Sequence, residues 1–127
     1  MYSVIRFTGP VSLLRVLGAS INDSMPGTFD GIAKRGDSFA IAVSNSASWV
    51  DHRNSATVIL RSLENTIHDI DHSKIRICFD VACEPMDYES HLLSEMHFDS
   101  ELLSILTQTG TSATISIYAG LDVNLET

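Results

Sequence analysis

Two histidines four residues apart, His68 and His72, are the clearest metal-ligating pattern in the sequence, with Asp69 and Asp71 beside them. On a continuous helix, side chains four apart share one face, and imidazole is a common zinc ligand. However, no glutamate base accompanies them as in the zinc-protease helix motif, no third ligand is evident, and the helix is expected to end near Ile70. We therefore favour histidines that interact with the carbonyl end of a helix dipole, and we expect neither a metal nor another cofactor.

A second polar cluster further along the chain consists of Glu89, His91, Glu95 and His97. Residues 88–96 are ambiguous between a helix and an additional strand, so their spacing does not define which of these side chains share a face. The cluster is a weaker metal candidate than the first pair.

A short polar run, Trp49-Val50-Asp51-His52-Arg53, contains the single tryptophan of the chain. It stands between an expected strand and the longest expected helix, and we interpret it as a loop. Such a loop could hold a ligand or an acid–base pair, so a small-ligand binder or an enzyme would use Trp49, His52 and Arg53. The alternative is that the tryptophan covers the core.

Motifs for covalent or nucleotide chemistry are missing from the sequence. No serine lies in a glycine-flanked nucleophile turn, and the glycines form neither a phosphate loop nor a dinucleotide fingerprint. We therefore expect no catalytic residues, and we favour a binding role over an enzyme.

Charge is unevenly distributed along the 127 residues, whose formal net charge is −8. Residues 1–63 contain six Lys and Arg against four Asp and Glu, whereas residues 64–127 contain two against twelve. The dense acidic stretch consists of Asp80, Glu84, Asp87, Glu89, Glu95, Asp99 and Glu101. This balance argues against nucleic acid or an anionic membrane as a partner, since both require a cationic surface.

Two interpretations of the acidic stretch stay open. It can be a solvated face that only aids solubility, or a docking surface for a basic protein partner, because complementary potentials accelerate and orient association. The second interpretation predicts a protein-binding module with Asp80, Glu84, Asp87, Glu89 and Glu95 in its binding surface. A homo-oligomer is also compatible with the sequence and would predict an exposed apolar patch.

The elements that must position these residues follow from periodicity and turn signals. Expected strands cover residues 3–7, 39–43, 75–83 and 113–119, and expected helices cover 10–18, 55–70 and 99–110. Gly18 is expected to end the first helix, Asp99 to cap the last one and Gly110 to follow its end. We predict one α+β domain over residues 1–127, with a mostly antiparallel sheet of about four to five strands and two to three helices on one face.

Several of these segments resemble a known family. Residues 98–103, Phe-Asp-Ser-Glu-Leu-Leu, and residues 115–118, Ile-Ser-Ile-Tyr, together with Leu17-Gly18 and the aromatic start of a strand at Phe39, resemble the bacterial family called domain of unknown function 4279. Where that family often has a proline and a tryptophan, this chain has Ile21 and Phe39. The resemblance implies no established activity. The acidity and small size of the chain allow a role as an immunity or other antagonist protein in bacterial toxin systems.

The compartment is predicted from two observations. The N-terminus lacks the apolar core of a secretion signal, and no run approaches the ~20 apolar residues of a membrane helix, so we expect a cytoplasmic protein with no membrane partner. Cys78 and Cys83 lie five apart in one expected strand, on opposite faces of the sheet, so they are expected to be free thiols that serve in packing.

Overall fold

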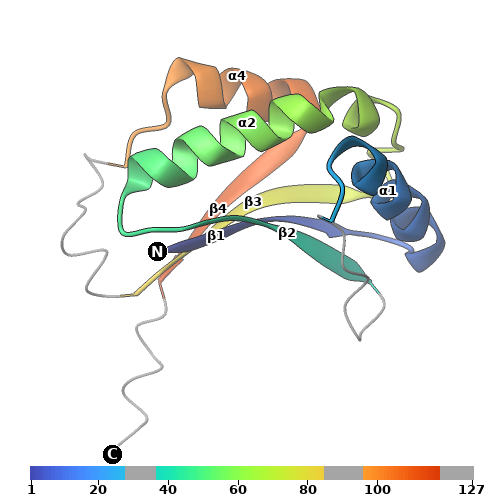
Figure 1. Ribbon diagram of the computed structural model, residues 1–127, viewed down its shortest axis with the longest axis horizontal. Helices are drawn as coiled ribbons and strands as arrows, with labels where there is room; N and C mark the ends of the chain where they lie inside the picture. The colour runs from blue at the N-terminus through green and yellow to red at the C-terminus, as the bar shows by residue number, and fades with distance from the viewer. Residues whose placement is uncertain (28–36, 85–95, 118–127) are drawn as a thin grey trace, which may run out of the picture.

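The computed structural model describes residues 1–27, 37–84 and 96–117, which form a four-stranded sheet and three helices (Figure 1). In chain order the elements are β1 (Tyr2–Thr8), α1 (Val11–Ser24), β2 (Ser38–Asn45), α2 (Trp49–His68), β3 (Arg76–Cys83), α4 (Ser100–Thr109) and β4 (Thr111–Ile117). The order of strands and helices is the one expected from the sequence.

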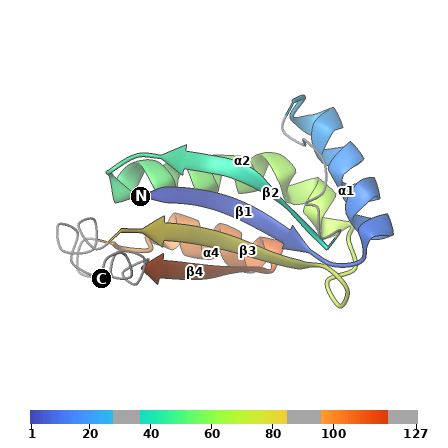
Figure 2. The same cartoon turned by 90° about the horizontal axis from the view of Figure 1, so that it is seen from below.

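The sheet is mixed, with strand order β2-β1-β3-β4. β1 pairs antiparallel with both β2 and β3, whereas β3 and β4 are parallel (Figure 2). Two of the three strand pairs are therefore antiparallel, which confirms the expected character of the sheet.

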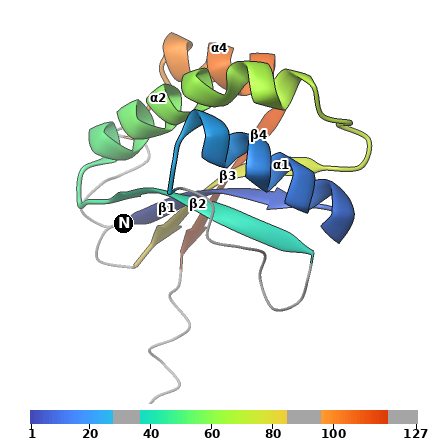
Figure 3. The same ribbon diagram turned by 45° about the vertical axis from the view of Figure 1, so that its right-hand side comes forward.

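The helices lie on one face of the sheet, with α2 and α4 side by side across it and α1 over one end (Figures 1 and 3). The core between the two layers contains Ile5, Phe7, Phe39, Ile41, Ile77, Phe79 and Val81 from the sheet, and Leu14, Leu17, Ile21, Leu60, Leu63, Ile67, Leu102 and Ile105 from the helices. Burial of each such side chain stabilises the fold by about 1.5–3 kcal/mol before the entropy cost. The α+β fold with helices packed on the sheet is confirmed.

The first helix is longer than expected, because it does not end at Gly18 but continues to Ser24. Leu14, Leu17 and Ile21 follow spacings of three and four, so the helix buries one continuous face. Packing of Ile21, which is fully buried, offsets the roughly 1 kcal/mol that a glycine costs inside a helix. The prediction of a loop from residue 19 onwards was therefore wrong for residues 19–24.

The second helix begins at Trp49 and not near Ser55, so the expected loop at residues 49–53 is helical. Trp49, His52 and Ala56 are all buried, and their spacings of three and four extend the apolar face that Leu60 and Leu63 continue. The loop prediction was wrong because it took the polar residues at 49–53 as a loop signal and missed this helical periodicity.

The last helix is confirmed with both of its expected ends. Asp99 accepts a hydrogen bond from the Leu102 amide at 2.9 Å, and Gly110 adopts a left-handed conformation with φ of 64°. The ambiguous segment 88–96 lies outside the described residues except for Met96, which is buried. Among the described helices, none is both long and apolar enough to cross a membrane.

Candidate functional site

Trp49 lies in the core and not at a ligand site. Its side chain is 2% exposed, its Nε1 donates to the carbonyl oxygen of His97 at 2.7 Å, and its ring packs on Phe79 and Phe98. These contacts join the start of α2 to β3 and to the segment that leads into α4. This position agrees with the alternative interpretation of the sequence, in which the tryptophan covers the core.

His52 is fully buried one turn further along α2, with a partner at each ring nitrogen. Nε2 lies 2.7 Å from the carbonyl oxygen of Ser46, and Nδ1 lies 2.6 Å from Oγ of Ser3 on β1. Because a carbonyl oxygen only accepts, Nε2 carries the proton, and in the neutral ring Nδ1 accepts from the Ser3 hydroxyl. The imidazole therefore bridges β1, α2 and the turn before α2.

Arg53 is the third member of the predicted ligand loop, and it faces the start of α4. Its Nε lies 3.3 Å from Oδ2 of Asp99, whose other carboxylate oxygen caps α4 through Leu102. One aspartate thus caps the beginning of α4 and forms an ion pair with an arginine of α2. The structure brings Trp49, His52 and Arg53 to one region of the fold, and it places each against other parts of the chain.

The predicted acidic binding residues are only partly described. Asp87, Glu89 and Glu95 lie outside the described residues, as does His91 of the second polar cluster. Asp80 lies on the sheet face that the helices leave uncovered, 3.5 Å from Arg6. Glu84 follows β3 directly and is exposed.

The starts of α2 and α4 and the end of β3 lie at the same end of the molecule (Figures 1 and 2), and four acidic residues lie at these three element ends. We call this surface the acidic end; it consists of Asp51, Glu84, Asp99 and Glu101. Negative charge near the first turn of a helix is also favourable for the helix itself. Asp80 does not belong to this surface, because it lies in the interior of β3.

Part of the acidic charge is balanced by arginines of the first half of the chain. Besides the pairs of Asp80 and Asp99, the Arg61 guanidinium lies 3.8 Å from the Glu101 carboxylate. In the fold, arginines of the first half of the sequence thus form ion pairs with carboxylates of the acidic second half. Exposed pairs such as Arg61–Glu101 contribute about 0–1 kcal/mol each.

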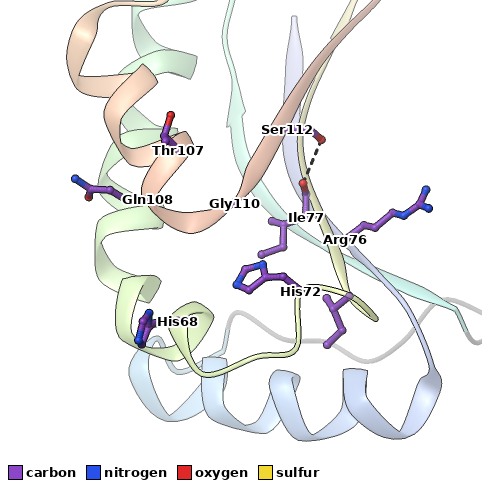
Figure 4. Close-up of a pocket in the computed structure, with 9 residues that line it drawn as sticks. His68, His72, Arg76, Ile77, Thr107, Gln108, Gly110 and Ser112 are labelled. Atoms are coloured by element: carbon purple, nitrogen blue, oxygen red, sulfur yellow. Dashed lines mark hydrogen bonds between the residues drawn. The ribbon is translucent and has the colours of Figure 1, made fainter.

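A hollow lies at the opposite end of α2. It is an open cleft of about 640 Å³, lined by His68, His72, Ile75, Arg76, Ile77, Thr107, Gln108, Gly110 and Ser112 (Figure 4). In Figure 4 the His72 ring lies between β3 and the end of α4, while Arg76 and Gln108 point away from it on opposite sides. The lining residues therefore do not converge as an acid–base pair would.

The two predicted metal candidates both line this cleft, but they do not share a helix face. α2 ends at His68, and His72 lies beyond it in the turn that leads to β3. Nε2 of His72 donates to the carbonyl oxygen of Ile67 at 3.1 Å, so this histidine caps the end of α2 as the dipole interpretation expects. No group of three potential metal ligands occurs within residues 1–27, 37–84 and 96–117.

Asp71 organises the turn between His68 and β3. Its carboxylate accepts from the hydroxyl of Ser73 at 2.6 Å and from the amide of Ser73 at 2.9 Å. These hydrogen bonds stabilise the ionised form, so the pKa of Asp71 lies below its ordinary value, with small contributions from Lys74 and His72. The aspartate therefore has a structural partner and is not aimed at a metal.

Five cleft residues, Arg76, Thr107, Gln108, Gly110 and Ser112, were not singled out from the sequence. Arg76 lies on β3 and the other four lie within residues 107–112, so the parallel pairing of β3 with β4 is what brings Arg76 to them. The one local signal was Gly110, which sequence analysis assigned to the end of the last helix. Its left-handed conformation is what turns the chain directly into β4.

Comparison with known proteins adds no relative, because no family model, curated protein or solved structure matches the chain. The resemblance to domain of unknown function 4279 therefore stays a prediction.

Proposed function

We propose that this protein is a protein-binding module and that its acidic end docks on a basic surface of a partner protein. The observation that carries the proposal is that Asp51, Glu84, Asp99 and Glu101, up to 50 residues apart in sequence, lie at element ends that share one end of the fold (Figure 2). An acidic surface on a chain of net charge −8 attracts a basic partner and orients it.

The interior supports binding over catalysis. Trp49 and His52, which could have formed a ligand site, are 2% and 0% exposed and hold the fold together. The side chains of the described cleft do not converge on one point (Figure 4). An inhibitor of a toxin, in the manner of an immunity protein, is one role that a small acidic module of this kind would fill.

The proposal is tested by two variants that change the net charge equally. Glu84→Lys/Glu101→Lys removes charge from the acidic end but spares Asp99, which caps α4, and Asp51, which accepts from Ser46. Asp23→Lys/Asp69→Lys places the same charges at the C-terminal ends of α1 and α2, where lysine is favourable. Tagged wild type and both variants are used to capture proteins from a lysate of the source organism at low and high salt.

A partner that binds through the acidic end is captured by the wild type and by Asp23→Lys/Asp69→Lys, and lost in Glu84→Lys/Glu101→Lys. Its capture also weakens at high salt, since the Debye length falls to about 3 Å at 1 M. Equal loss in both variants would show that only net charge matters and would contradict a docking role for the acidic end.

A second candidate function is the binding of a small anionic ligand in the cleft. The observation that favours it is the lining itself, which contains His68, His72 and Arg76 and no described carboxylate, in a protein of net charge −8. Titration with inorganic phosphate and with acetate, followed by amide chemical shifts, tests this directly. Saturable shifts at His72, Gly110 and Ser112 would support it, and their absence up to tens of millimolar would exclude it.

A further inference from the structure

β4 forms one edge of the sheet and carries none of the features that usually protect an edge strand. Its sequence, Thr111-Ser112-Ala113-Thr114-Ile115-Ser116-Ile117, contains no charged residue, proline or glycine, and four of its seven residues are β-branched. Within the described ranges no segment pairs with its outer side. Natural edge strands are commonly protected by lysine, proline or a bulge, because unpaired N–H and C=O groups recruit other strands.

The opposite edge of the sheet differs in one respect. β2 contains a bulge, since Ser3 of β1 pairs with Ser44 and Val4 pairs with Ala42, which leaves Val43 as an extra residue. β4 instead keeps an uninterrupted register along its whole length, from Ile77↔Thr111 to Cys83↔Ile117. The edge formed by β4 is thus the straighter one and the better suited to pair with another strand.

Apolar side chains of β4 also remain uncovered on the side that faces the helices. Ile117 is 42% exposed and Ala113 is exposed, whereas their neighbours on β3, Cys83 and Phe79, are 1% and 0% exposed. The helical layer therefore covers the inner face of β3 fully and that of β4 only in part, since Thr111 is buried and Ile115 is partly buried against the core. A strand added beyond β4, together with what packs on it, would cover these residues.

We propose that two copies of this chain pair through antiparallel β4 strands, which makes one continuous eight-stranded sheet across a two-fold axis. In the register that places Thr114 opposite Thr114 of the second copy, Ala113 meets Ile115 and Thr111 meets Ile117 on the helix side. On the other side, Ser112 meets Ser116. Ala113 thus faces an apolar side chain, and Ser112 and Thr114 face hydroxyls; only Thr111 and Ile117 pair a hydroxyl-bearing residue with an apolar one. Most of the strand is therefore complementary to itself, as a two-fold interface requires.

Charge permits a second copy to bind at this edge and opposes its binding over most of the remaining surface. Two molecules of net charge −8 repel each other over most of their surface, so self-association is least opposed where no charge is presented. β4 presents none. The acidic end, in contrast, would bring like charges together, and the docking proposed for it does not depend on this pairing.

Analytical ultracentrifugation of the full chain between about 1 and 200 μM tests the proposal. The wild type is expected to reach twice the chain mass of 13.9 kDa. Thr114→Lys places two ammonium groups opposite each other at the two-fold axis, and should raise the dimer dissociation constant at least about tenfold. Ala40→Lys, an equal substitution at an exposed position of β2, is the matched control and should leave the dissociation constant unchanged.

A mixture of Thr114→Lys and Thr114→Glu separates lost pairing from lost folding. Opposite charges then face each other across the axis, so the mixture is expected to regain the dimer that Thr114→Lys alone loses. A wild type that stays monomeric over the whole concentration range would overturn the proposal. A dimer that Ala40→Lys disrupts and Thr114→Lys leaves intact would also overturn it, because it would place the interface at β2.

Discussion

Nδ1 of His52 lies 2.6 Å from Oγ of Ser3, and both residues are fully buried although 49 positions separate them in the sequence. The Ser46 carbonyl oxygen occupies the other side of the same imidazole, at 2.7 Å from Nε2. This hydrogen-bonded bridge connects the first strand of the sheet to the first turn of α2. It satisfies the buried polar atoms of both side chains next to a core cluster of apolar residues.

Ser3→Ala removes the partner of His52 Nδ1 and leaves a buried polar atom without a hydrogen bond. We expect the free energy of unfolding to fall by about 1–3 kcal/mol, measured by urea denaturation. Ser62→Ala, which removes an exposed hydroxyl that bonds to the Val58 carbonyl oxygen, should change it by less than about 0.5 kcal/mol. Equal effects in both variants would contradict a stabilising role for the Ser3–His52 bond.

Trp49 is the single tryptophan and is 2% exposed, so its fluorescence reports on the core directly. The emission maximum of the native protein should lie to the blue of that of the unfolded chain, and acrylamide should quench it weakly. Trp49→Phe removes the hydrogen bond to the His97 carbonyl oxygen and should lower the free energy of unfolding by about 1–3 kcal/mol. Native emission at the wavelength of the unfolded chain would show that the ring is not buried.

Asp99 has two roles that two substitutions can separate. Asp99→Ala removes the cap of α4 and the partner of Arg53, and should destabilise the protein by about 1–2 kcal/mol. Asp99→Asn keeps a side-chain oxygen for the Leu102 amide, so it should lose only the ion pair and cost less than half as much. If both substitutions have the same effect on urea denaturation, the ion pair and not the cap is the dominant contribution.

Gly110→Ala forces an alanine into a left-handed conformation, with φ of 64°, and places a Cβ 3.1 Å from Nδ1 of His72. Gly27 also has a positive φ, of 82°, but nothing lies within 4 Å of a Cβ there. Gly27→Ala should therefore cost only the roughly 1–2 kcal/mol of the backbone conformation, and Gly110→Ala should cost more. The excess should shrink in a His72→Ala background; an unchanged difference would exclude the His72 contact as its cause.

The lowered pKa of Asp71 predicts a pH dependence with a definite sign. Because the folded pKa is depressed below 3.8, the contribution of Asp71 to stability is fully present above that pH and is lost as the pH falls through the folded pKa. Ser73→Ala removes the largest cause of the shift, so the pKa of Asp71 should rise toward 3.8 in an NMR titration of its carboxyl carbon. Gly27→Ala, which is distant from this turn, should leave that titration unchanged.

Elements with local signals, such as β3 and α4, could be predicted from the sequence alone. The alternation from Ile75 to Cys83 defined β3 because a half-buried strand repeats every two residues, and Asp99 and Gly110 marked α4 because capping groups act within one turn. The lengths of α1 and α2 were underestimated for the opposite reason. Gly18 and most of the residues at 49–53 have a low local propensity for helix. Burial of Ile21 and Trp49 against distant residues outweighs this low propensity, so both helices are longer than predicted.

The roles of the candidate residues were decided only by the tertiary structure. Whether His52 is a catalytic base or a core residue depends on Ser3, and whether Arg53 meets a ligand or a helix cap depends on Asp99. These partners stand 49 and 46 positions away in the chain, so spacing within the run 49–53 contains no information about them. The same holds for charge: the sequence showed an acidic second half, and only the packing of α2, α4 and β3 brought four carboxylates to one end of the molecule.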